Sequence, residues 1–383
     1  MSFFKTAAPL TTILMTAFLA GCGLFSSKSG PQMSELASFK PTIEVQEVWK
    51  YKIGEAGDSV FVPAVVGNAI FVASKEGKIA RLEAGREVWK IETKQLLSGG
   101  VASDGKLVVV GTRQGDVLAF AAADGKLIWK AKASSEVLAP VAFSSLGVLV
   151  RSGDNTLYLY AAADGKRLWI YTRVNPPLAL RSTAAPVVAE PYAFVGLPGG
   201  KIAGISLQNG ALVWEGAVTL PKGTTELERV ADVVSSPLVD GRLTCAVSYQ
   251  GRLACFDVAN GGSLTWAREM SSIRALSSDS RHIYAADDRS AVLAFDRESG
   301  NPSWKNTQFL LRQASSPLAI ARRGLVAVGD VQGYVHFLSR EDGSFAARMK
   351  TDGSPIVAAP QIFGASTVLV QTSDGGIFAF EIQ

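Results

Sequence analysis

The 383-residue chain has only two histidines, His282 and His336, and only three cysteines. Neither histidine has a second histidine or a cysteine at the spacing of metal ligands. The sequence also lacks the G-x-S-x-G, Walker and H-E-x-x-H motifs that mark hydrolases, nucleotide-binding proteins and zinc proteases. We therefore expect both histidines to be structural, and we expect no catalytic residue, no bound metal and no cofactor.

Charged residues are also scarce, at 19% of the chain with a formal net charge of +4. Nucleic-acid-binding proteins cluster basic residues on one face or stripe, so this composition argues against such a partner. Beyond the first 21 residues, no apolar run is long enough to cross a bilayer as a helix.

Seven tryptophans recur at intervals of 40, 40, 40, 45, 52 and 38 residues. They are Trp49, Trp89, Trp129, Trp169, Trp214, Trp266 and Trp304. A period near 40 is typical of folds built from similar units, each too small to bury its own apolar face.

Each repeat reads as four short strands, here named A to D, with the tryptophan on strand D. Two adjacent copies, Gly111 to Trp129 and Arg151 to Trp169, show the pattern clearly, and both place Asp-Gly shortly before the tryptophan. Glycine after aspartate supplies the positive φ of a tight hairpin turn. Four strands in about 40 residues form a β-propeller blade, whereas a series of β-sandwiches would not repeat at this interval.

The blade count is eight, although the tryptophans are seven. Phe345, 41 residues after Trp304, occupies the eighth tryptophan position. Three strands follow it before the chain ends at Gln383, and no A, B or C strand precedes Trp49. The sequence therefore predicts an all-β, eight-bladed propeller whose ring is closed by the amino-terminal strand, with each tryptophan packed between blades.

Residues 1–21 form a targeting segment in which Lys5 precedes an apolar stretch ending in Leu19-Ala20-Gly21. Small residues directly before Cys22 resemble the lipobox of bacterial lipoproteins, although a plain secretory signal is an alternative. The resemblance implies cleavage before Cys22 and acylation of its sulfur, for example with palmitate, which would hold the chain at a membrane. Gly23 replaces the aspartate that retains enteric lipoproteins at the inner membrane, and this favours the outer membrane. We expect residues 22–42 to be the lipidated cysteine and a flexible tether, and residues 43–383 to be the propeller.

Cys245 and Cys255 lie on adjacent strands B and C of the fifth repeat. A three-residue turn, Tyr249 to Gly251 with the glycine in the left-handed conformation, places them opposite each other, whereas a two-residue turn places them on opposite faces. An oxidising compartment allows a disulfide. We expect two small buried apolar side chains instead.

Two connections between blades are longer than the others and belong to consecutive blades, so we expect them side by side on one face of the ring. The first insert is Tyr171 to Pro186, and the second insert is Gly216 to Pro237. Pro176-Pro177 should stiffen the first insert and push Leu178 and Leu180 outward, and residues 225–229 of the second favour a short helix. Exposed leucines beside Arg181 and Asp232 are a typical protein-binding composition, with apolar anchors and a charged rim. The alternative is that the leucines only cap the channel.

The repeat Gly-x-hydrophobic-x-Ala-Phe…Asp-Gly-x-x-x-Trp resembles the PQQ-like repeat of quinoprotein propellers. With its lipobox and eight blades, the chain is similar to the propeller lipoproteins of the outer-membrane β-barrel assembly (BAM) machinery. The most specific stretches are residues 178–188, 224–233 and 329–343.

This resemblance implies a non-catalytic scaffold at the outer membrane that faces the periplasm and assists the folding and insertion of β-barrel proteins. It implies docking onto BamA through a POTRA domain, indirect contact with other BAM components, and a weaker association with nascent outer-membrane proteins. By position, the partner-binding residues are Leu178, Leu180, Arg181 and Asp232, where Arg181 and Asp232 either pair across the interface or fix each other. Val234 stands where the family often has a second acidic residue, which predicts a weaker or shifted charged contact.

Two other functions fit the same fold. A PQQ-dependent dehydrogenase would need calcium-binding and catalytic carboxylates, often beside vicinal cysteines, and the chain has no Cys-Cys pair. A cell-wall or carbohydrate-binding lipoprotein would need a channel lined with aromatic and aspartate side chains. The sequence alone does not identify the lining residues.

Overall fold

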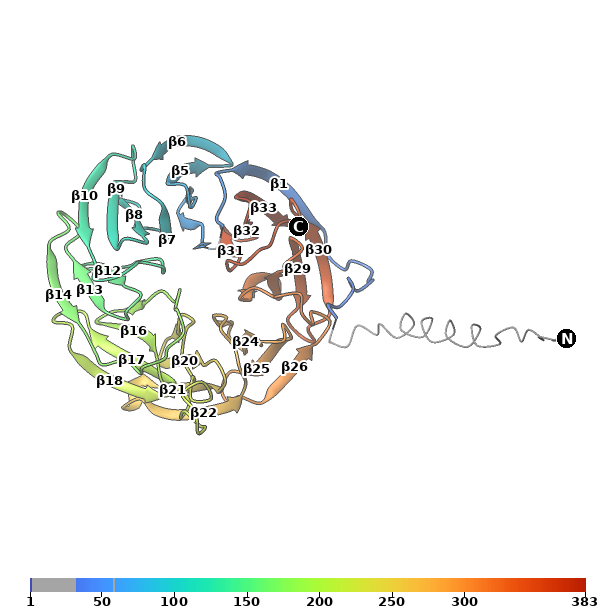
Figure 1. The fold of residues 1–383 in the computed structure, drawn as a ribbon. Helices are drawn as coiled ribbons and strands as arrows, with labels where there is room; N and C mark the ends of the chain where they lie inside the picture. The colour runs from blue at the N-terminus through green and yellow to red at the C-terminus, as the bar shows by residue number, and fades with distance from the viewer. Residues whose placement is uncertain (2–31, 58) are drawn as a thin grey trace. The chain divides into compact units, whose positions relative to one another are not determined.

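The computed structural model describes Met1 and residues 32–57 and 59–383, and the predicted signal peptide and Cys22 lie outside these ranges. Within residues 33–383, eight sheets, each built on four antiparallel strands, surround a central channel (Figure 1). The predicted eight-bladed propeller is therefore confirmed. None of the described residues forms a helix that is long and apolar enough to span a membrane.

The blades are numbered one to eight from the sheet that begins with β3. The innermost A strands are β3 (Ala64–Val66), β7 (Leu97–Ser103), β11 (Ala142–Ser144), β15 (Val187–Ala189), β19 (Leu238–Asp240), β23 (Ser277–Ser278), β27 (Leu318–Ile320) and β31 (Gln361–Phe363). The B strands are β4 (Ala69–Ala73), β8 (Leu107–Thr112), β12 (Gly147–Arg151), β16 (Tyr192–Leu197), β20 (Leu243–Val247), β24 (His282–Ala286), β28 (Leu325–Gly329) and β32 (Thr367–Gln371). The C strands are β5 (Lys78–Glu83), β9 (Asp116–Ala121), β13 (Leu157–Tyr160), β17 (Lys201–Ser206), β21 (Arg252–Asp257), β25 (Val292–Asp296), β29 (Tyr334–Ser339) and β33 (Gly376–Ile382).

The D strands form the outer rim in Figure 1. They are β6 (Arg86–Glu92), β10 (Leu127–Lys132), β14 (Arg167–Tyr171), β18 (Leu212–Ala217), β22 (Ser263–Glu269), β26 (Pro302–Asn306), β30 (Phe345–Lys350) and β1 (Val45–Lys52). Two short 3-10 helices, η1 (Val258–Asn260) and η2 (Ala321–Arg323), lie in turns.

The ring closes where β1 pairs with β33, from Val45 opposite Ile382 to Lys52 opposite Gly376. The amino-terminal strand thus supplies the outer strand of blade eight, as the sequence predicts. Closure pairs the last C strand, which would otherwise remain an exposed sheet edge.

Each tryptophan packs on the glycine of the next blade's C–D turn. At Gly165, where φ is +71°, an added β-carbon would lie 2.7 Å from the ring of Trp129. The Trp129 Nε1–H also donates to the carbonyl of Ala162, at 2.8 Å. The turn glycine therefore has two roles, because it adopts the left-handed conformation and leaves room for the neighbouring indole.

Phe345 is the exception for a topological reason. The next blade is the one closed by the amino-terminal strand, so no C–D turn follows to receive an indole. Instead Phe39, from the segment leading into β1, stacks on Phe345 with ring centroids 5.3 Å apart. The Arg348 guanidinium lies over the Phe39 ring at 4.9 Å.

The segment before β1 is bound to the propeller over part of the predicted tether. The Ser34 N–H donates to the Leu310 carbonyl at 2.9 Å, and the buried Arg312 donates to the Ser34 carbonyl at 2.8 Å. The Thr42 N–H donates to the carbonyl of Ala346 at 2.9 Å. Residues 34–42 therefore contact blade seven, and the sequence did not predict this contact.

A further extended segment, β2 (Val60–Phe61), was not predicted as a strand. It pairs in parallel with the inner edge of β7, placing Val60 opposite Gly99. The inner edge of blade two can therefore accept an extended chain.

Cys245 and Cys255 form a disulfide between β20 and β21, so the expectation of two reduced apolar side chains is wrong. The turn has three residues, but Gln250 adopts the left-handed conformation (φ +50°), not Gly251 as expected. This turn keeps the two cysteines directly opposite each other.

Candidate partner-docking surface

The two inserts lie on one face of the ring, named here the insert face. The second insert contacts the B–C turn of blade five, because the Tyr249 N–H donates to the Asp232 carbonyl at 2.9 Å. It also contacts the end of β16 in blade four, where the Val233 N–H donates to the Leu197 carbonyl at 3.2 Å. The first insert meets the second where the Leu180 N–H donates to the Asp232 carboxylate, so the inserts lie beside each other as predicted.

Asp232 is buried, with only 1% of its surface exposed. Its Oδ2 accepts the N–H of Leu180 at 2.6 Å, and its Oδ1 accepts the N–H of Gly199 at 2.8 Å. One carboxylate therefore joins the second insert, the first insert and the B–C turn of blade four. Asp232 thus holds the backbone beneath the insert face in place. The sequence had instead suggested a position on the exposed charged rim.

Arg151 lies beneath the same region and was not singled out from the sequence. It is buried and donates to Asn155 Oδ1 at 2.6 Å and to the carbonyl of Ala184, at the end of the first insert, at 3.4 Å. Burial lowers the pKa of Arg151 to about 10, an effect that attraction to Asp232 opposes. The charge of Asp232 is thus partly balanced within the fold.

Arg181 makes an ion pair with Glu136, a residue of the connection between blades two and three. The Arg181 Nε donates to Glu136 Oε1 at 2.7 Å. From the sequence, one expected role of Arg181 and Asp232 was to fix each other's position. These contacts differ from that, because Asp232 binds the backbone N–H groups of Leu180 and Gly199. Arg181 instead pairs with Glu136. The Arg181 side chain remains 57% exposed.

The exposed apolar side chains only partly match the sequence prediction. Leu178 is 44% exposed, whereas Leu180 is half-buried. Val174, Leu220 and Leu227 are more exposed than either, at 94%, 66% and 71%. The signal that could have identified them is their position in long connections between strands, where no blade partner covers them.

A hollow of about 190 Å³ lies between the inserts. It is lined by Pro176, Leu178, Gly199, Pro221, Glu226, Arg229 and Asp232. Apolar walls with charged side chains of both signs are a suitable receptor for an anchor residue of a partner protein.

The expected helix at residues 225–229 is a single capped turn. The Arg229 N–H donates to the Thr225 carbonyl at 3.2 Å, and no regular helix follows. Glu228 caps it by accepting the N–H groups of Thr224 and Thr225 at 2.8 and 3.0 Å. These backbone bonds lower the pKa of Glu228 to about 2. The turn ends because Val230 is buried and the following residues extend into the ring.

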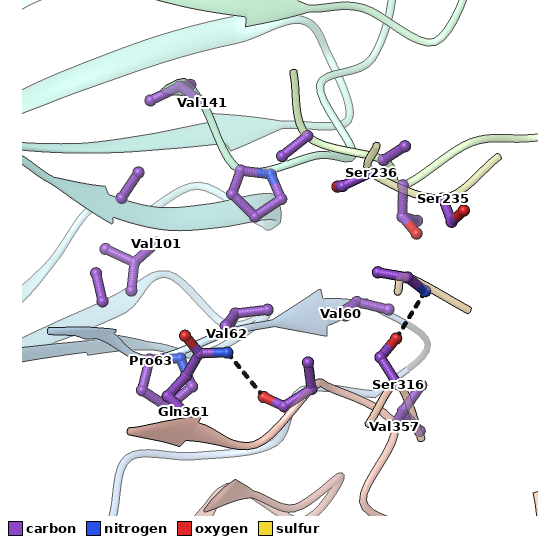
Figure 2. Close-up of a pocket in the computed structure, with 18 of the residues that line it drawn as sticks. Val60, Val62, Pro63, Val101, Val141, Ser235, Ser236, Ser316, Val357 and Gln361 are labelled. Atoms are coloured by element: carbon purple, nitrogen blue, oxygen red, sulfur yellow. Dashed lines mark hydrogen bonds between the residues drawn. The ribbon is translucent and has the colours of Figure 1, made fainter. Parts of the chain in front are cut away.

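The central channel has a volume of about 670 Å³ (Figure 2). Val234, the position flagged by the sequence, is buried and lines this channel, so it does not belong to the charged rim. Among the described residues the lining contains no aspartate or glutamate, and Phe143 is its only aromatic residue. The lining thus offers neither the carboxylates of a quinoprotein dehydrogenase nor the aromatic and aspartate surface of a carbohydrate site.

Both histidines are buried in hydrogen-bonded positions inside blades six and seven. In the part of the chain that the structure describes, no three histidine, cysteine, aspartate or glutamate residues come together as metal ligands.

Comparison with known proteins places this geometry in a family. Residues 75–306 match the family model described as "Outer membrane protein assembly factor BamB". The chain is 41% identical over 377 residues to the BamB protein of Bordetella pertussis, covering 98% of this chain and 96% of that protein. It is 41% identical over 385 residues to the protein of the same name from Pseudomonas aeruginosa, covering 99% of both chains.

Solved structures agree with the fold. The crystal structure of BamB from Moraxella catarrhalis superposes with a TM-score of 0.82 at 26% identity, covering 88% of this chain and all (100%) of that one. A quinohemoprotein alcohol dehydrogenase from Comamonas testosteroni has a TM-score of 0.73 at 12% identity, covering 88% of this chain and 76% of that one. The second likeness shows only that the propeller architecture is shared.

Proposed function

Because this chain belongs to the BamB family of outer membrane protein assembly factors, we propose that it is a scaffold whose insert face docks onto a periplasmic domain of BamA. It acts as an assembly factor and not as an enzyme, and it works at the outer membrane. An acyl group on Cys22 anchors it there, with the ring in the periplasm. Other BAM components are reached through BamA, and nascent outer-membrane proteins are further clients.

One observation supports the docking proposal above the others. The two longest inter-blade connections lie together, expose Leu178 and Leu227, and are held from below by the buried carboxylate of Asp232. A rigid base under exposed apolar anchors lowers the entropy cost of association. Residues at the centre of such surfaces often contribute 2 kcal/mol or more to binding, so a few substitutions should be decisive.

The test replaces Leu178 and Leu227 with serine in one variant and measures binding to purified BamA periplasmic domains. We expect affinity to fall by about 30-fold or more, since about 2 kcal/mol corresponds to that factor. The melting temperature should be nearly unchanged, because both side chains are exposed, at 44% and 71%, and neither belongs to the core.

Leu264→Ser is the matched control. Leu264 is 50% exposed, but it lies on the outer strand β22 and not on the insert face. The control should bind as the unmodified chain does. If the double variant binds equally well, the docking surface lies elsewhere and the proposal fails.

A further inference from the structure

Among the described residues, the central channel is lined by one charged side chain. Of the described residues that line it, only Arg274 is ionisable, while the others are mainly valine, alanine, proline and serine. Figure 2 shows how this lining is dominated by short apolar and hydroxyl side chains.

The Arg274 side chain has no hydrogen-bond or ion-pair partner among the described residues. It is half-buried, and desolvation lowers its pKa, with no carboxylate or hydrogen bond acting in the opposite direction. The two buried arginines differ, because Arg151 bonds to Asn155 and Arg312 bonds to Asp330 at 2.9 Å. A half-buried guanidinium that no carboxylate neutralises, in a channel lined by uncharged side chains, is a favourable site for an anion.

The Arg274 end of the channel opens on the insert face. Arg274 precedes β23, and the lining residues Thr183 to Ala185 and Val234 to Ser236 similarly precede β15 and β19. These last two segments are the ends of the two inserts. A protein held at the inserts is therefore placed at the channel mouth.

The surroundings of Arg274 suit an extended peptide. Ser236 and Ser316 offer hydroxyl groups, and the neighbouring Ile273 is 49% exposed. The inner edge of blade two already carries the extended segment β2, which pairs with β7. A volume of about 670 Å³ also lies within the usual range for ligand sites, roughly 300–1,000 Å³.

We propose that the channel mouth binds the carboxyl-terminal end of an extended apolar peptide, with Arg274 pairing with the terminal carboxylate. Guanidinium and carboxylate form paired charge-assisted hydrogen bonds, and the valine and alanine walls accept the preceding side chains. The inference rests on the proposed function only because that function brings unfolded chains to the insert face.

The test titrates the purified chain with acetyl-Val-Ala-Val-Ala carrying a free carboxylate, and separately with its carboxamide. We expect the acid to bind at least about tenfold more tightly than the amide, since a charge-assisted bond is lost in the amide. Arg274→Gln should abolish this preference, and Arg274→Lys should retain part of it. Thermal melts of both variants establish that they are folded.

Arg322→Gln is the matched control, because Arg322 is exposed in η2 and does not line the channel. It should bind both peptides as the unmodified chain does. Equal binding of acid and amide, a preference that persists in Arg274→Gln, or no binding of either peptide would overturn the proposal. Acetate binding as tightly as the peptide acid would overturn the peptide part. The titration contains no BamA, so its failure leaves the docking proposal to its own test.

Discussion

At the scale of single residues, the tryptophan–glycine contact links each blade to the next except at the junction of blades seven and eight. The Trp169 ring lies against Gly210 as Trp129 lies against Gly165, and its Nε1–H donates to Leu207 at 2.7 Å. The repeat predicts both residues, but only the structure shows that they belong to different blades and meet each other.

We expect Gly165→Ala to destabilise the fold by about 1–3 kcal/mol more than Gly241→Ala. Both glycines have positive φ, at +71° and +63°, so both substitutions carry the left-handed strain of about 1–2 kcal/mol. Only Gly165 also faces an indole, whereas no atom lies within 4 Å of a β-carbon at Gly241. Denaturant unfolding measures both values, and equal losses would show that the indole contact contributes little.

His336 is a second residue whose environment has a measurable consequence. Its Nε2 lies 3.0 Å from Asp330 Oδ2, and Arg348 Nε donates to its Nδ1 at 3.1 Å. Arg312 also pairs with Asp330. Burial is the main cause that lowers the pKa of His336, and so the folded state keeps the ring neutral.

Because the pKa of His336 is lower in the folded chain than in the unfolded chain, the free energy of unfolding depends on pH. The unfolded chain binds a proton at His336 near pH 6.5, and the folded chain binds it only at lower pH. The contribution of the neutral His336 ring to the free energy of unfolding is therefore fully present above about pH 6.5, and it is lost as the pH falls below that value. We expect His336→Gln to lose less stability than the unmodified chain between pH 7.5 and 5.5, as measured by urea unfolding. The same loss in both proteins would contradict this assignment.

At the scale of elements, the hairpin β20–β21 shows how one turn decides a covalent bond. The sequence left two turn lengths open, and they place Cys245 and Cys255 on the same or on opposite faces. The three-residue turn pairs them, and Gln250 accommodates the left-handed position.

Replacing both cysteines with alanine should lower the free energy of unfolding by about 2–3 kcal/mol, because the disulfide closes a loop with a sequence separation of 10. Dithiothreitol should lower the melting temperature of the unmodified chain but not that of the double variant. A reductant effect that persists in the double variant would have another origin.

At the scale of the whole molecule, ring closure places the amino terminus. Strand β1 completes blade eight, and Ser34 and Phe39 attach the preceding segment to blade seven. The described residues that precede β1 therefore lie against blade seven.

Cys22→Ser tests the membrane anchor directly. Without a cysteine to acylate, we expect the protein to move from the membrane fraction to the soluble periplasmic fraction, because the acyl chains would supply the attachment. Fractionation followed by immunoblotting measures this, with the Cys245/Cys255 alanine variant as a control that stays with the membrane. An unchanged membrane fraction would mean that Cys22 is not the anchor.

The sequence by itself determined the repeat and its consequences: eight blades, the closing strand, and the two long connections at residues 171–186 and 216–237. These features depend on periodicity and chain length, which survive in one dimension because each blade is a local unit. Only the tertiary structure decided that Asp232 is buried under Leu180, that Arg181 pairs with Glu136, and that Arg274 stands unpaired in the channel. Each of these depends on contacts between blades far apart in the chain, and no local pattern encodes which side chains then meet or remain in water.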